Sequence, residues 1–549
     1  MEFKKNQIVE LYIDDIGNEG EGIGHIDGYA LFLKDAVIGD KVRAKIIKTK
    51  KNYGFARVEE VIEASKDRVS PRCSKARQCG GCTLQHLAYE KQLEYKFNKV
   101  KNCLERIGGL ENIEEKMEPI LGMEEPFYYR NKAQFPVGYD KEGNLITGFY
   151  AGRTHHIIDC THCMIQHPVN EQILLKVLDY MKKNNITAYD EKIHKGLVRH
   201  IVTRVGFKTG EVMVCLVVNG SKKNLRNLEM LVDSLTEIEG MTSICVNINK
   251  EKTNRILGSK IEEVYGKPYI YDYIGNVKYQ IGPLSFFQVN PTQTKVLYEK
   301  AMEYADLKGE ETVWDLYCGI GTISLFLAQK AKKVYGVEIV KEAIDDARLN
   351  AKMNGFDNAE FFVGKAEEVL PREYEKNGVY ADTIVVDPPR KGCDSKLLET
   401  MVKMAPKRIV YVSCDPATLA RDLKVLSEQG YEVEKVCAVD QFSHSSHVET
   451  VVLLSQQKPD DTIEIDLDLD ELDATSAELK ATYQEIKDYV LKEFGLKVSS
   501  LYISQVKRKC GIEVGENYNL PKSENARVPQ CPKEKEDAIK AALKYYAMI

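Results

Sequence analysis

The sequence predicts a multidomain α/β protein whose largest unit is a doubly wound, mostly parallel sheet. The chain has 549 residues, more than one hydrophobic core ordinarily supports, so three or four domains are expected. Near residue 281 the pattern changes from closely spaced strand-like segments to strand-like and helical segments in alternation. Hydrophobic residues make up 43% and charged residues 29% of the chain, which is typical of a globular protein.

Residues 1–63 are predicted to form a small OB-like β-barrel, because glycines separate short runs of alternating apolar residues. Such barrels often bind oligonucleotides; a barrel that only packs against its neighbours is the alternative. Residues 41–57 contain seven basic residues and no acidic one. The segment resembles the TRAM domain of RNA-modifying enzymes, which implies an RNA-facing surface with a basic rim and an aromatic ring. This surface would consist of Lys48, Lys50, Lys51 and Tyr53.

The next segments are distinguished by their patterns. Residues 64–115 contain a cysteine cluster followed by a helical pattern, and residues 116–280 are expected to form a central β-rich RNA-binding domain. Residues 281–456 alternate strand-like runs (TVWDLYC, KKVYGVE, AEFFVG, ADTIVVD, RIVYVSC, TVVLLS) with helical stretches, which predicts a Rossmann-like domain.

The remainder of the chain is an acidic linker and a helical module. In the predicted linker, residues 457–475, eight acidic residues and no basic one occur from Pro459 to Asp473. Residues 476–549 form the module, in which an apolar helical face is expected. This face consists of Tyr483, Ile486, Val490 and Phe494. A helix-turn-helix-like nucleic-acid contact and a solvated accessory domain both remain open for it.

The bulk properties favour the cytoplasm. No apolar run is long enough to cross a bilayer, and the first residues show no signal-peptide pattern. The 14 cysteines therefore favour metal binding or catalysis over disulfides. The net charge of −6 argues mildly against nucleic-acid binding for the chain as a whole, but local patches decide phosphate affinity. We expect a cytoplasmic monomer that does not associate with membranes.

The strongest local motif is DLYCGIGT, which begins at Asp315. Gly319 and Gly321, at a strand-to-helix turn, let a ligand approach the backbone at a helix N-terminus, although a plain tight turn has the same pattern. Glu338 ends the next strand-like run, where a carboxylate can bind both ribose hydroxyls of a nucleoside. NAD and S-adenosylmethionine both fit this order.

The following strand-like run distinguishes these two cofactors. It ends in Asp387-Pro388-Pro389, which resembles the substrate-side motif of methyltransferases and favours S-adenosylmethionine. Methyltransferases that act on amines usually have an aromatic residue after the two prolines, whereas Arg390 stands here. An exocyclic amine is therefore a less favoured target.

Two further residues suggest catalysis. Cys414 stands at the tip of the run RIVYVSC, where ligands bind in an open α/β sheet. Packing is the usual role of a free cysteine, but the polar neighbours Ser413 and Asp415 favour a reactive thiol. Glu449 opens the last apolar run, where a carboxylate is costly unless it forms a salt bridge or has a catalytic role.

A thiol and a carboxylate suit methylation of uracil at C5. This carbon is too weak a nucleophile to attack a sulfonium methyl group unless a thiolate first adds to C6. A base must afterwards remove the C5 proton so that the thiolate can leave. We assign Cys414 as the nucleophile and Glu449 as the base, acting on a single-stranded or flipped-out uridine.

The chain resembles the RNA uracil-5-methyltransferase family, specifically the iron–sulfur enzymes of bacterial 23S ribosomal RNA. The resemblance covers roughly residues 1–456 and rests on SFFQVN (285–290), DLYCGIG (315–321), VDPPRKG (386–392), SCDP (413–416) and HSSHVET (444–450). It implies a 23S rRNA (uracil-5-)-methyltransferase of class EC 2.1.1, with the same nucleophile and base. The implied S-adenosylmethionine-binding residues are Gln288, Tyr317, Gly319, Gly321, Glu338 and Asp387.

The sequence departs from the family pattern at two places. Asp415 replaces an asparagine found in many relatives, which adds a charge beside the nucleophile. The segment QFSHSS lacks a proline that relatives carry before the HVE motif, which affects the shape of that loop.

A cysteine cluster predicts a metal site. Cys73, Cys79 and Cys82 have the spacing C-x5-C-x2-C, and Cys160 and Cys163 follow later. Thiolate ligands favour zinc or an iron–sulfur cluster, and the spacing alone does not distinguish them. The family resemblance implies a [4Fe–4S] cluster with Cys163 as the fourth ligand, while Cys160 competes for that place. The role is expected to be structural, since the chemistry contains no redox step.

Two other functions compete with this interpretation. An RNA cytosine-5-methyltransferase would use Cys393 near the DPP motif, but Lys391 and Gly392 intervene and Glu449 would have no role. A non-catalytic RNA-binding ribosome assembly factor would also use the barrel, the cysteines and the basic patch, but it needs no cofactor residues. Transfer RNA also remains open as the substrate, and neither the modified uridine nor the number of modified uridines is identified.

Overall fold

A computed structural model describes residues 3–152, 154–457, 482–512, 531–546 and 548–549. It divides into two compact units, Met1–Lys458 and Pro459–Ile549, which are described separately. Among the described residues, no helix is long and apolar enough to span a membrane. Most of the predicted acidic linker lies outside the described residues.

The first unit begins with a six-stranded sheet in the order β1-β5-β6-β4-β3-β2. Its strands are β1 (Ile8–Tyr12), β2 (Asp15–Ile16), β3 (Gly22–Ile26), β4 (Tyr29–Lys34), β5 (Lys41–Thr49) and β6 (Tyr53–Glu63). Alternate residues of β5, such as Val42, Ala44 and Ile46, are fully buried, as the period of a strand requires. The predicted RNA-facing residues Lys48, Lys50, Lys51 and Tyr53 are all exposed around the β5–β6 turn.

The central domain is a seven-stranded sheet in the order β10-β9-β8-β11-β12-β13-β14. Only β12 and β13 pair in parallel; the other pairs are antiparallel. Its strands are β8 (Lys132–Tyr139), β9 (Leu145–Tyr150), β10 (Ile157–Asp159), β11 (Val198–Val205), β12 (Val212–Val218), β13 (Met241–Ile248) and β14 (Lys260–Tyr265). Helices α2 (Val169–Lys183) and α3 (Leu228–Thr236) pack on it and bury Ile173, Val177 and Leu231.

The largest sheet has eight strands in the order β19-β18-β17-β20-β21-β23-β22-β7. Its strands are β17 (Thr312–Leu316), β18 (Lys333–Glu338), β19 (Ala359–Val363), β20 (Thr383–Val386), β21 (Arg408–Ser413), β22 (Tyr431–Val439), β23 (Glu449–Gln456) and β7 (Met117–Leu121). Strands β17 to β21 are parallel, and β23 runs antiparallel to β21. This is the predicted Rossmann-like domain.

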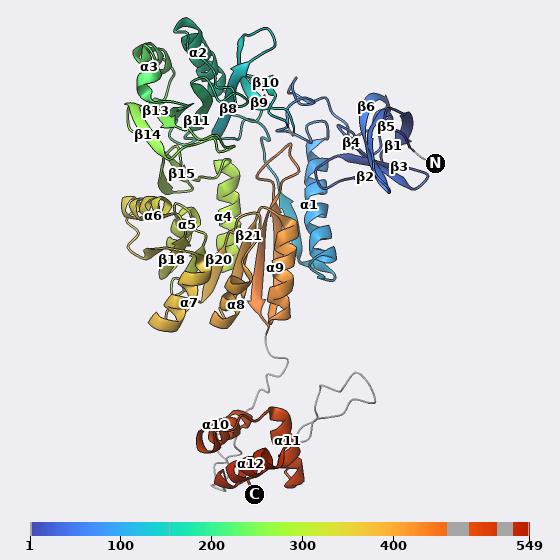
Figure 1. The fold of residues 1–549 in the computed structure, drawn as a ribbon, viewed down its shortest axis with the longest axis vertical. Coiled ribbons are helices and arrows are strands. Elements are labelled where there is room, and N and C mark those ends of the chain that lie inside the picture. Colours follow the sequence, from blue (N-terminus) through green and yellow to red (C-terminus); the bar gives the residue numbers. More distant parts are fainter. Residues whose placement is uncertain (1–2, 153, 458–481, 513–530, 547) are drawn as a thin grey trace. The chain divides into compact units, whose positions relative to one another are not determined.

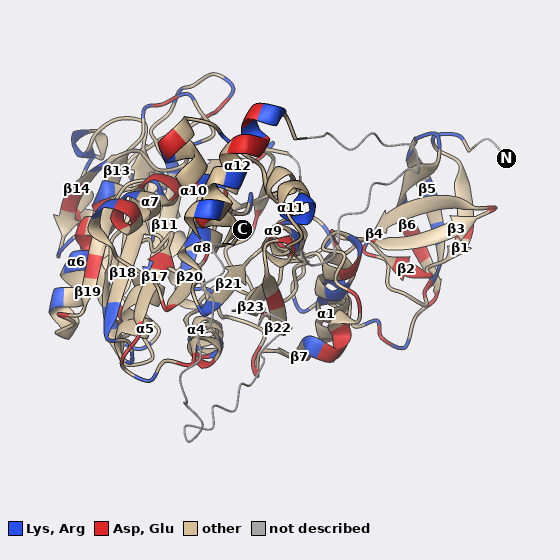
Figure 2. Ribbon diagram, turned by 90° about the horizontal axis from the view of Figure 1, so that it is seen from below, with Lys and Arg blue, Asp and Glu red and all other residues tan. Residues whose placement is uncertain are grey.

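Helices cover both faces of this sheet (Figure 1). Neighbouring strand residues alternate between the faces: Val313 packs under α4, α5 and α6, while Trp314 packs under α1, α7, α8 and α9. The helices are α1 (Tyr89–Arg106), α4 (Pro291–Ala305), α5 (Thr322–Ala328), α6 (Lys341–Asn354), α7 (Ala366–Asn377), α8 (Ser395–Met404) and α9 (Pro416–Glu428). In the ribbon of Figure 2, charged residues are marked mostly on the helices and the loops, which fits a sheet buried on both faces.

Two elements lie in a different sheet or core from the one that their position in the sequence suggests. Strand β7 falls inside the segment expected to form the central domain, yet it pairs in parallel with β22 at the edge of the large sheet. The hairpin of β15 (Ile270–Ile274) and β16 (Val277–Ile281) belongs to the core beneath α4, α5 and α6. Local sequence patterns identify a strand but not its partner, which is why these boundaries differ from the expected 116–280.

The second unit contains three described helices, α10 (Tyr483–Phe494), α11 (Ser500–Lys509) and α12 (Lys533–Tyr545). Two residues of the predicted apolar face, Ile486 and Val490, are fully buried. A third, Phe494, is 46% exposed. Thr482 and Glu485 form a capping box that begins α10. Residues 476–481 and 513–530 of the predicted module lie outside the described residues.

Candidate active site

A cavity of about 660 Å³ lies at the carboxyl ends of β17, β18, β20 and β21. Loops that leave parallel strands meet at this edge, so residues distant in sequence converge there. Six of the predicted residues line the cavity: Gln288, Tyr317, Glu338, Asp387, Cys414 and Glu449. The structure thus brings together the predicted cofactor residues and the predicted catalytic pair.

The remaining two cofactor residues shape the adjacent turn. Gly319 and Gly321 connect β17 to α5 with φ angles of +56° and +81°, which disfavour other residues. A Cβ atom at Gly321 would lie 3.2 Å from Ala347 and 3.3 Å from Phe361. Neither glycine lines the cavity itself, so their role is to hold the turn at the N-terminus of α5.

Carboxylates dominate the cofactor side of the cavity. Glu338 ends β18, and its Oε1 accepts a hydrogen bond from the Val340 backbone (2.9 Å). Burial raises the pKa of Asp387 to about 7. Beneath them, Asp315 is fully buried and accepts a hydrogen bond from Ser324, and burial raises its pKa to about 7. Carboxylates together with the Gln288 amide suit the ribose hydroxyls and the ammonium group of S-adenosylmethionine, so the residues fit this cofactor.

Cys414 and Glu449 lie at the adjacent ends of the neighbouring strands β21 and β23. Ser413 pairs with Thr450 at the end of the antiparallel β21–β23 ladder, and Cys414 and Glu449 are the next residues on the two segments. The charge of Glu449 acts on the Cys414 thiol, which places the two groups near each other. Both residues line the cavity, and Glu449 is only 4% exposed.

The surroundings of this pair shift both pKa values upwards. Burial, reinforced by Asp387, raises the pKa of Glu449 to about 8. Burial, together with Glu449 and Asp387, raises the pKa of the Cys414 thiol to about 11. The nearby Arg390 guanidinium opposes both shifts. A carboxyl group whose pKa lies near neutrality suits a general base.

Comparison with known proteins assigns the family. Residues 88–457 match the family described as tRNA (Uracil-5-)-methyltransferase, and residues 2–58 match the TRAM domain. The chain belongs to the tRNA (uracil-5-)-methyltransferase family. Relatives described as uncharacterized RNA methyltransferases include one from Clostridium tetani, 53% identical over 453 residues, and one from Halalkalibacterium halodurans, 52% identical over 451 residues. In each case the similarity covers 82% of this chain and 97% of the relative.

A solved structure shares the architecture. The tRNA (uracil-54, C5)-methyltransferase of Pyrococcus abyssi, in complex with S-adenosyl-L-homocysteine, is 30% identical with a TM-score of 0.66. The similarity covers 81% of this chain and 100% of that one. The predicted family, TRAM domain and methyltransferase fold are therefore confirmed, as is the predicted class of enzyme, an RNA methyltransferase. The family match ends at residue 457, before the C-terminal unit.

The loop between β22 and β23 supplies two further cavity residues: His447, which lies in the HSSHVET motif, and Phe442, which the sequence did not indicate. Helix α1 anchors the start of this loop through a fully buried ion pair between Lys96 Nζ and Asp440 Oδ1 (2.5 Å). Tyr89 donates a hydrogen bond to Asp440 Oδ2 (2.8 Å). The loop is thus fixed at its first residue by a helix that lies some 340 residues earlier in the chain.

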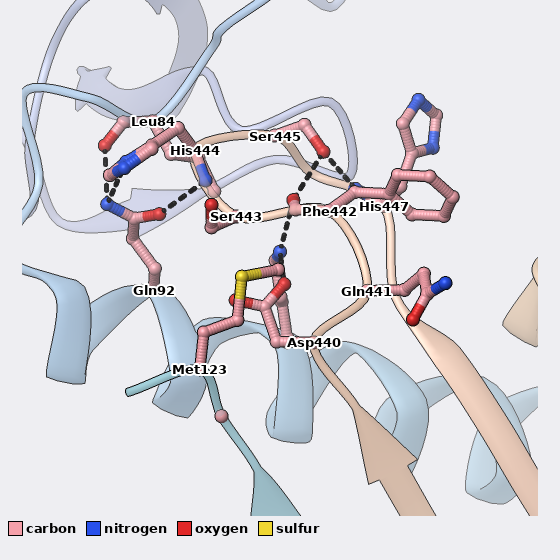
Figure 3. Close-up of polar contacts among 12 residues, drawn as sticks. Leu84, Gln92, Met123, Asp440, Gln441, Phe442, Ser443, His444, Ser445 and His447 are labelled. Carbon is pink, nitrogen blue, oxygen red and sulfur yellow. Dashed lines mark hydrogen bonds and ion pairs between the residues drawn. The ribbon is translucent and has the colours of Figure 1, made fainter. Parts of the chain in front are cut away.

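Gln92 of α1 holds the middle of the same loop (Figure 3). Its Oε1 accepts a hydrogen bond from the His444 backbone (2.9 Å), and its Nε2 donates to the backbone oxygens of Leu84 (3.0 Å) and Leu87 (2.8 Å). The backbone nitrogens of Thr83 and Leu84 donate to the His444 oxygen at 2.8 and 3.0 Å. The end of the cysteine-rich segment is therefore bound directly to the loop that leads to Glu449.

Cys393, the nucleophile of the rival cytosine mechanism, does not line the cavity. It is 7% exposed and belongs to the core beneath α8 and α9. Its backbone nitrogen donates to Asp422 (2.8 Å), and burial raises the pKa of its thiol to about 12. This position favours a packing role for Cys393 and leaves Cys414 as the thiol that faces the cavity.

Asp415 has a structural role beside the nucleophile. Its Oδ1 accepts hydrogen bonds from the backbone nitrogens of Ala417 (3.0 Å) and Thr418 (3.1 Å), which caps α9. Asparagine and aspartate are both good caps, so this departure from the family pattern preserves the turn after Cys414.

The predicted metal ligands lie in two neighbouring loops. Cys79 pairs with Ala151 in an isolated bridge, and the Cys160 thiol, which donates to the backbone oxygen of His162 (3.2 Å), influences the pKa of Cys73. Cys82 and Cys163 are close enough to the other thiols for charge on those to raise their pKa values, although burial is the larger cause. Among the described residues, however, no three metal-binding side chains adopt a ligating arrangement. The [4Fe–4S] cluster on Cys73, Cys79, Cys82 and Cys163 therefore stays a prediction.

Proposed function

We propose that this protein transfers a methyl group from S-adenosylmethionine to C5 of a uridine in 23S ribosomal RNA through a covalent adduct with Cys414. The observation that carries the proposal is that Cys414 and Glu449, at the ends of β21 and β23, line one cavity together with the predicted cofactor residues. A thiol and a base on one face of one cavity are what C5 methylation of uracil requires.

The chemistry can be written for this chain's own residues. Cys414 Sγ forms a bond to C6, and the C5–C6 π electrons move toward C5 and O4. S-adenosylmethionine supplies the methyl group that C5 takes when this cofactor is bound. Glu449 then removes the C5 proton, the C5–C6 double bond re-forms, and the S–C6 bond breaks to regenerate the thiolate. Because C5 and C6 are shielded in a stacked helix, the uridine must be single-stranded or flipped out.

The RNA substrate has two candidates. The resemblance to iron–sulfur enzymes of 23S ribosomal RNA supports that RNA, and the similarity to the Pyrococcus abyssi tRNA enzyme favours transfer RNA as the second candidate. In either case, the exposed basic rim of the TRAM domain provides a surface for a single strand.

We also propose a structural [4Fe–4S] cluster on Cys73, Cys79, Cys82 and Cys163. The support is a donor set of thiols gathered from two loops, which suits such a cluster. Its place would be beside Thr83 and Leu84, whose backbones bind His444. No step of the methylation passes through the cluster.

The decisive experiment maps 5-methyluridine in ribosomal and transfer RNA from cells with and without this protein. Loss of a 5-methyluridine from 23S ribosomal RNA supports the proposal. Loss from transfer RNA alone would move the substrate to transfer RNA. Unchanged 5-methyluridine in both RNAs, with no binding of labelled S-adenosylmethionine, would favour a non-catalytic assembly factor.

A further inference from the structure

Three cationic side chains gather beside the active-site cavity. Lys132 begins β8 and stands directly opposite Arg204 of β11 in the antiparallel ladder. Arg130, two residues before Lys132, lines the cavity. Like charges placed opposite each other in a sheet are destabilising, so this arrangement requires an explanation.

The two arginines have partners within the protein. Arg204 is 2% exposed and donates to the backbone oxygen of Ser285, which begins the segment SFFQVN. When the Gln166 amide is oriented with its oxygen toward Arg130, it accepts a hydrogen bond from Arg130 Nε (3.3 Å). These contacts give both guanidinium groups a structural role.

The ammonium group of Lys132 lacks a comparable structural role. Among the described residues, Arg204 and Arg130 act against its charge, the thiol of Cys215 opposes them weakly, and no carboxylate compensates the two cations. Burial together with these two cations lowers the pKa of Lys132 to about 7. The residue as a whole is half-buried, so part of it remains in contact with solvent.

The location indicates which anion. Asn131, between Arg130 and Lys132, donates from Nδ2 to the backbone oxygen of Gln288 (3.0 Å), one of the predicted cofactor residues. Phe286, in the same segment, is 70% exposed and lines the cavity. Arg130 therefore shares the cavity with an exposed aromatic ring on which a base can stack, and Lys132 follows it two residues further along the chain.

We propose that Lys132, flanked by Arg130 and Arg204, binds a backbone phosphate of the RNA next to the uridine that enters the cavity. This inference rests on the proposed function, since it assumes an RNA substrate. A phosphate supplies the negative charge that the protein does not, and a lysine binds it as a point charge without needing a fixed orientation. A carboxylate of another protein could also bind Lys132. Such a partner would leave the exposed ring of Phe286 and the cavity without a role.

The test compares Lys132→Met with the wild-type protein, using a fluorescein-labelled single-stranded oligoribonucleotide that contains uridine. Loss of the charge should weaken RNA binding about tenfold and reduce the dependence of log affinity on log salt by about one. The same variant should unfold at the same or a higher temperature, because it relieves repulsion from Arg204. Binding of S-adenosylmethionine should not change.

A matched control is Lys300→Met, since Lys300 is also half-buried but pairs with Glu118 (2.9 Å) and Glu303 (2.7 Å). That variant should lose stability and keep its affinity for RNA. If Lys132→Met does not fold, Lys132→Arg should fold and preserve the salt dependence, whereas Lys132→Gln should reduce it.

A neutral methylphosphonate, placed in turn at each linkage of the oligonucleotide, identifies the contact. At one linkage, the methylphosphonate should weaken the binding of the oligonucleotide to the wild-type protein. At the same linkage, it should leave the affinity of the Lys132→Met protein unchanged. Equal losses for both proteins at every linkage, or wild-type affinity and salt dependence in Lys132→Met, would overturn the inference. Failure of the proposed function is separate: it would appear as wild-type protein that binds RNA but forms no 5-methyluridine.

Discussion

Cys414 and Glu449 directly adjoin the Ser413–Thr450 pair that ends the β21–β23 ladder, and the charge of Glu449 acts on the Cys414 thiol. Their sequence separation is bridged by α9, β22 and the loop anchored by α1. This arrangement places the thiol and the carboxyl group on one face of one cavity, and the first three predictions below follow from it.

Replacement of Cys414 separates the two possible nucleophiles. Cys414→Ala should abolish methylation, because no other thiol at the cavity can add to C6, while S-adenosylmethionine still binds. Cys393→Ala should keep most of the activity, because Cys393 is a core residue. Methyl transfer from labelled S-adenosylmethionine to RNA measures both variants. An active Cys414→Ala protein and an inactive, folded Cys393→Ala protein would establish the cytosine-type scheme instead.

Replacement of Glu449 should stop the reaction after methyl transfer. In Glu449→Gln the C5 proton cannot leave, so the S–C6 bond persists and turnover falls by the roughly 10²–10⁴-fold typical of a lost general base. Denaturing gel electrophoresis with labelled RNA should show a slow band that needs both Cys414 and the methyl donor. Normal turnover without a trapped band would remove Glu449 from the mechanism and make His447 the candidate base.

The charges near Cys414 should set the pH at which its thiol becomes reactive. Negative neighbours should raise that pH, and positive neighbours should lower it. Burial, Glu449 and Asp387 raise its pKa to about 11, and Arg390 lowers it. Alkylation of Cys414 should therefore accelerate as the pH rises toward 11. Glu449→Gln should shift this profile to lower pH, and Arg390→Leu to higher pH. Iodoacetamide labelling read by mass spectrometry gives the rates; shifts in the same direction for both variants would contradict this electrostatic account.

The hydrogen bonds of Gln92 should matter for the rate of the reaction. Gln92→Leu leaves the His444 nitrogen and the Leu84 and Leu87 oxygens without this partner, at a cost of about 1–3 kcal/mol each. Displacement of the loop that carries His447 should lower kcat at least about tenfold and leave KM for S-adenosylmethionine unchanged. Gln329→Leu, at the far end of α5, is the control. A lower melting temperature with unchanged kcat would limit Gln92 to bracing the fold.

The metal content tests the cysteine prediction. Anaerobically purified protein should be brown, with iron and sulfide near four each per chain. Cys163→Ser should lose the colour and Cys160→Ser should keep it. The reverse result would make Cys160 the fourth ligand, in line with the mutual effect of Cys73 and Cys160 on their pKa values. Zinc without iron would refute the cluster.

Much of the cavity could be predicted from the sequence. Gln288, Tyr317, Glu338, Asp387, Cys414 and Glu449 each belong to a motif at a strand end or a helix start, and all six line one cavity. His447 belongs to the HSSHVET motif, whereas Phe442 was missed because it lies in an irregular loop without periodicity. Arg130 was missed because the central domain shows no motif around it.

The sequence alone determined six strands of the large sheet, the glycine turn and the residue types that the chemistry needs, because periodicity and turn residues are local properties. It did not identify β22 (Tyr431–Val439). The tertiary structure decided which distant segments meet: β7 with β22, Gln92 with His444, and Lys132 with Arg204. These contacts depend on how the sheets and α1 pack, and packing is a property of the whole chain that no short segment encodes. For this reason, the lysine without a carboxylate partner beside the cavity is evident only in the folded protein.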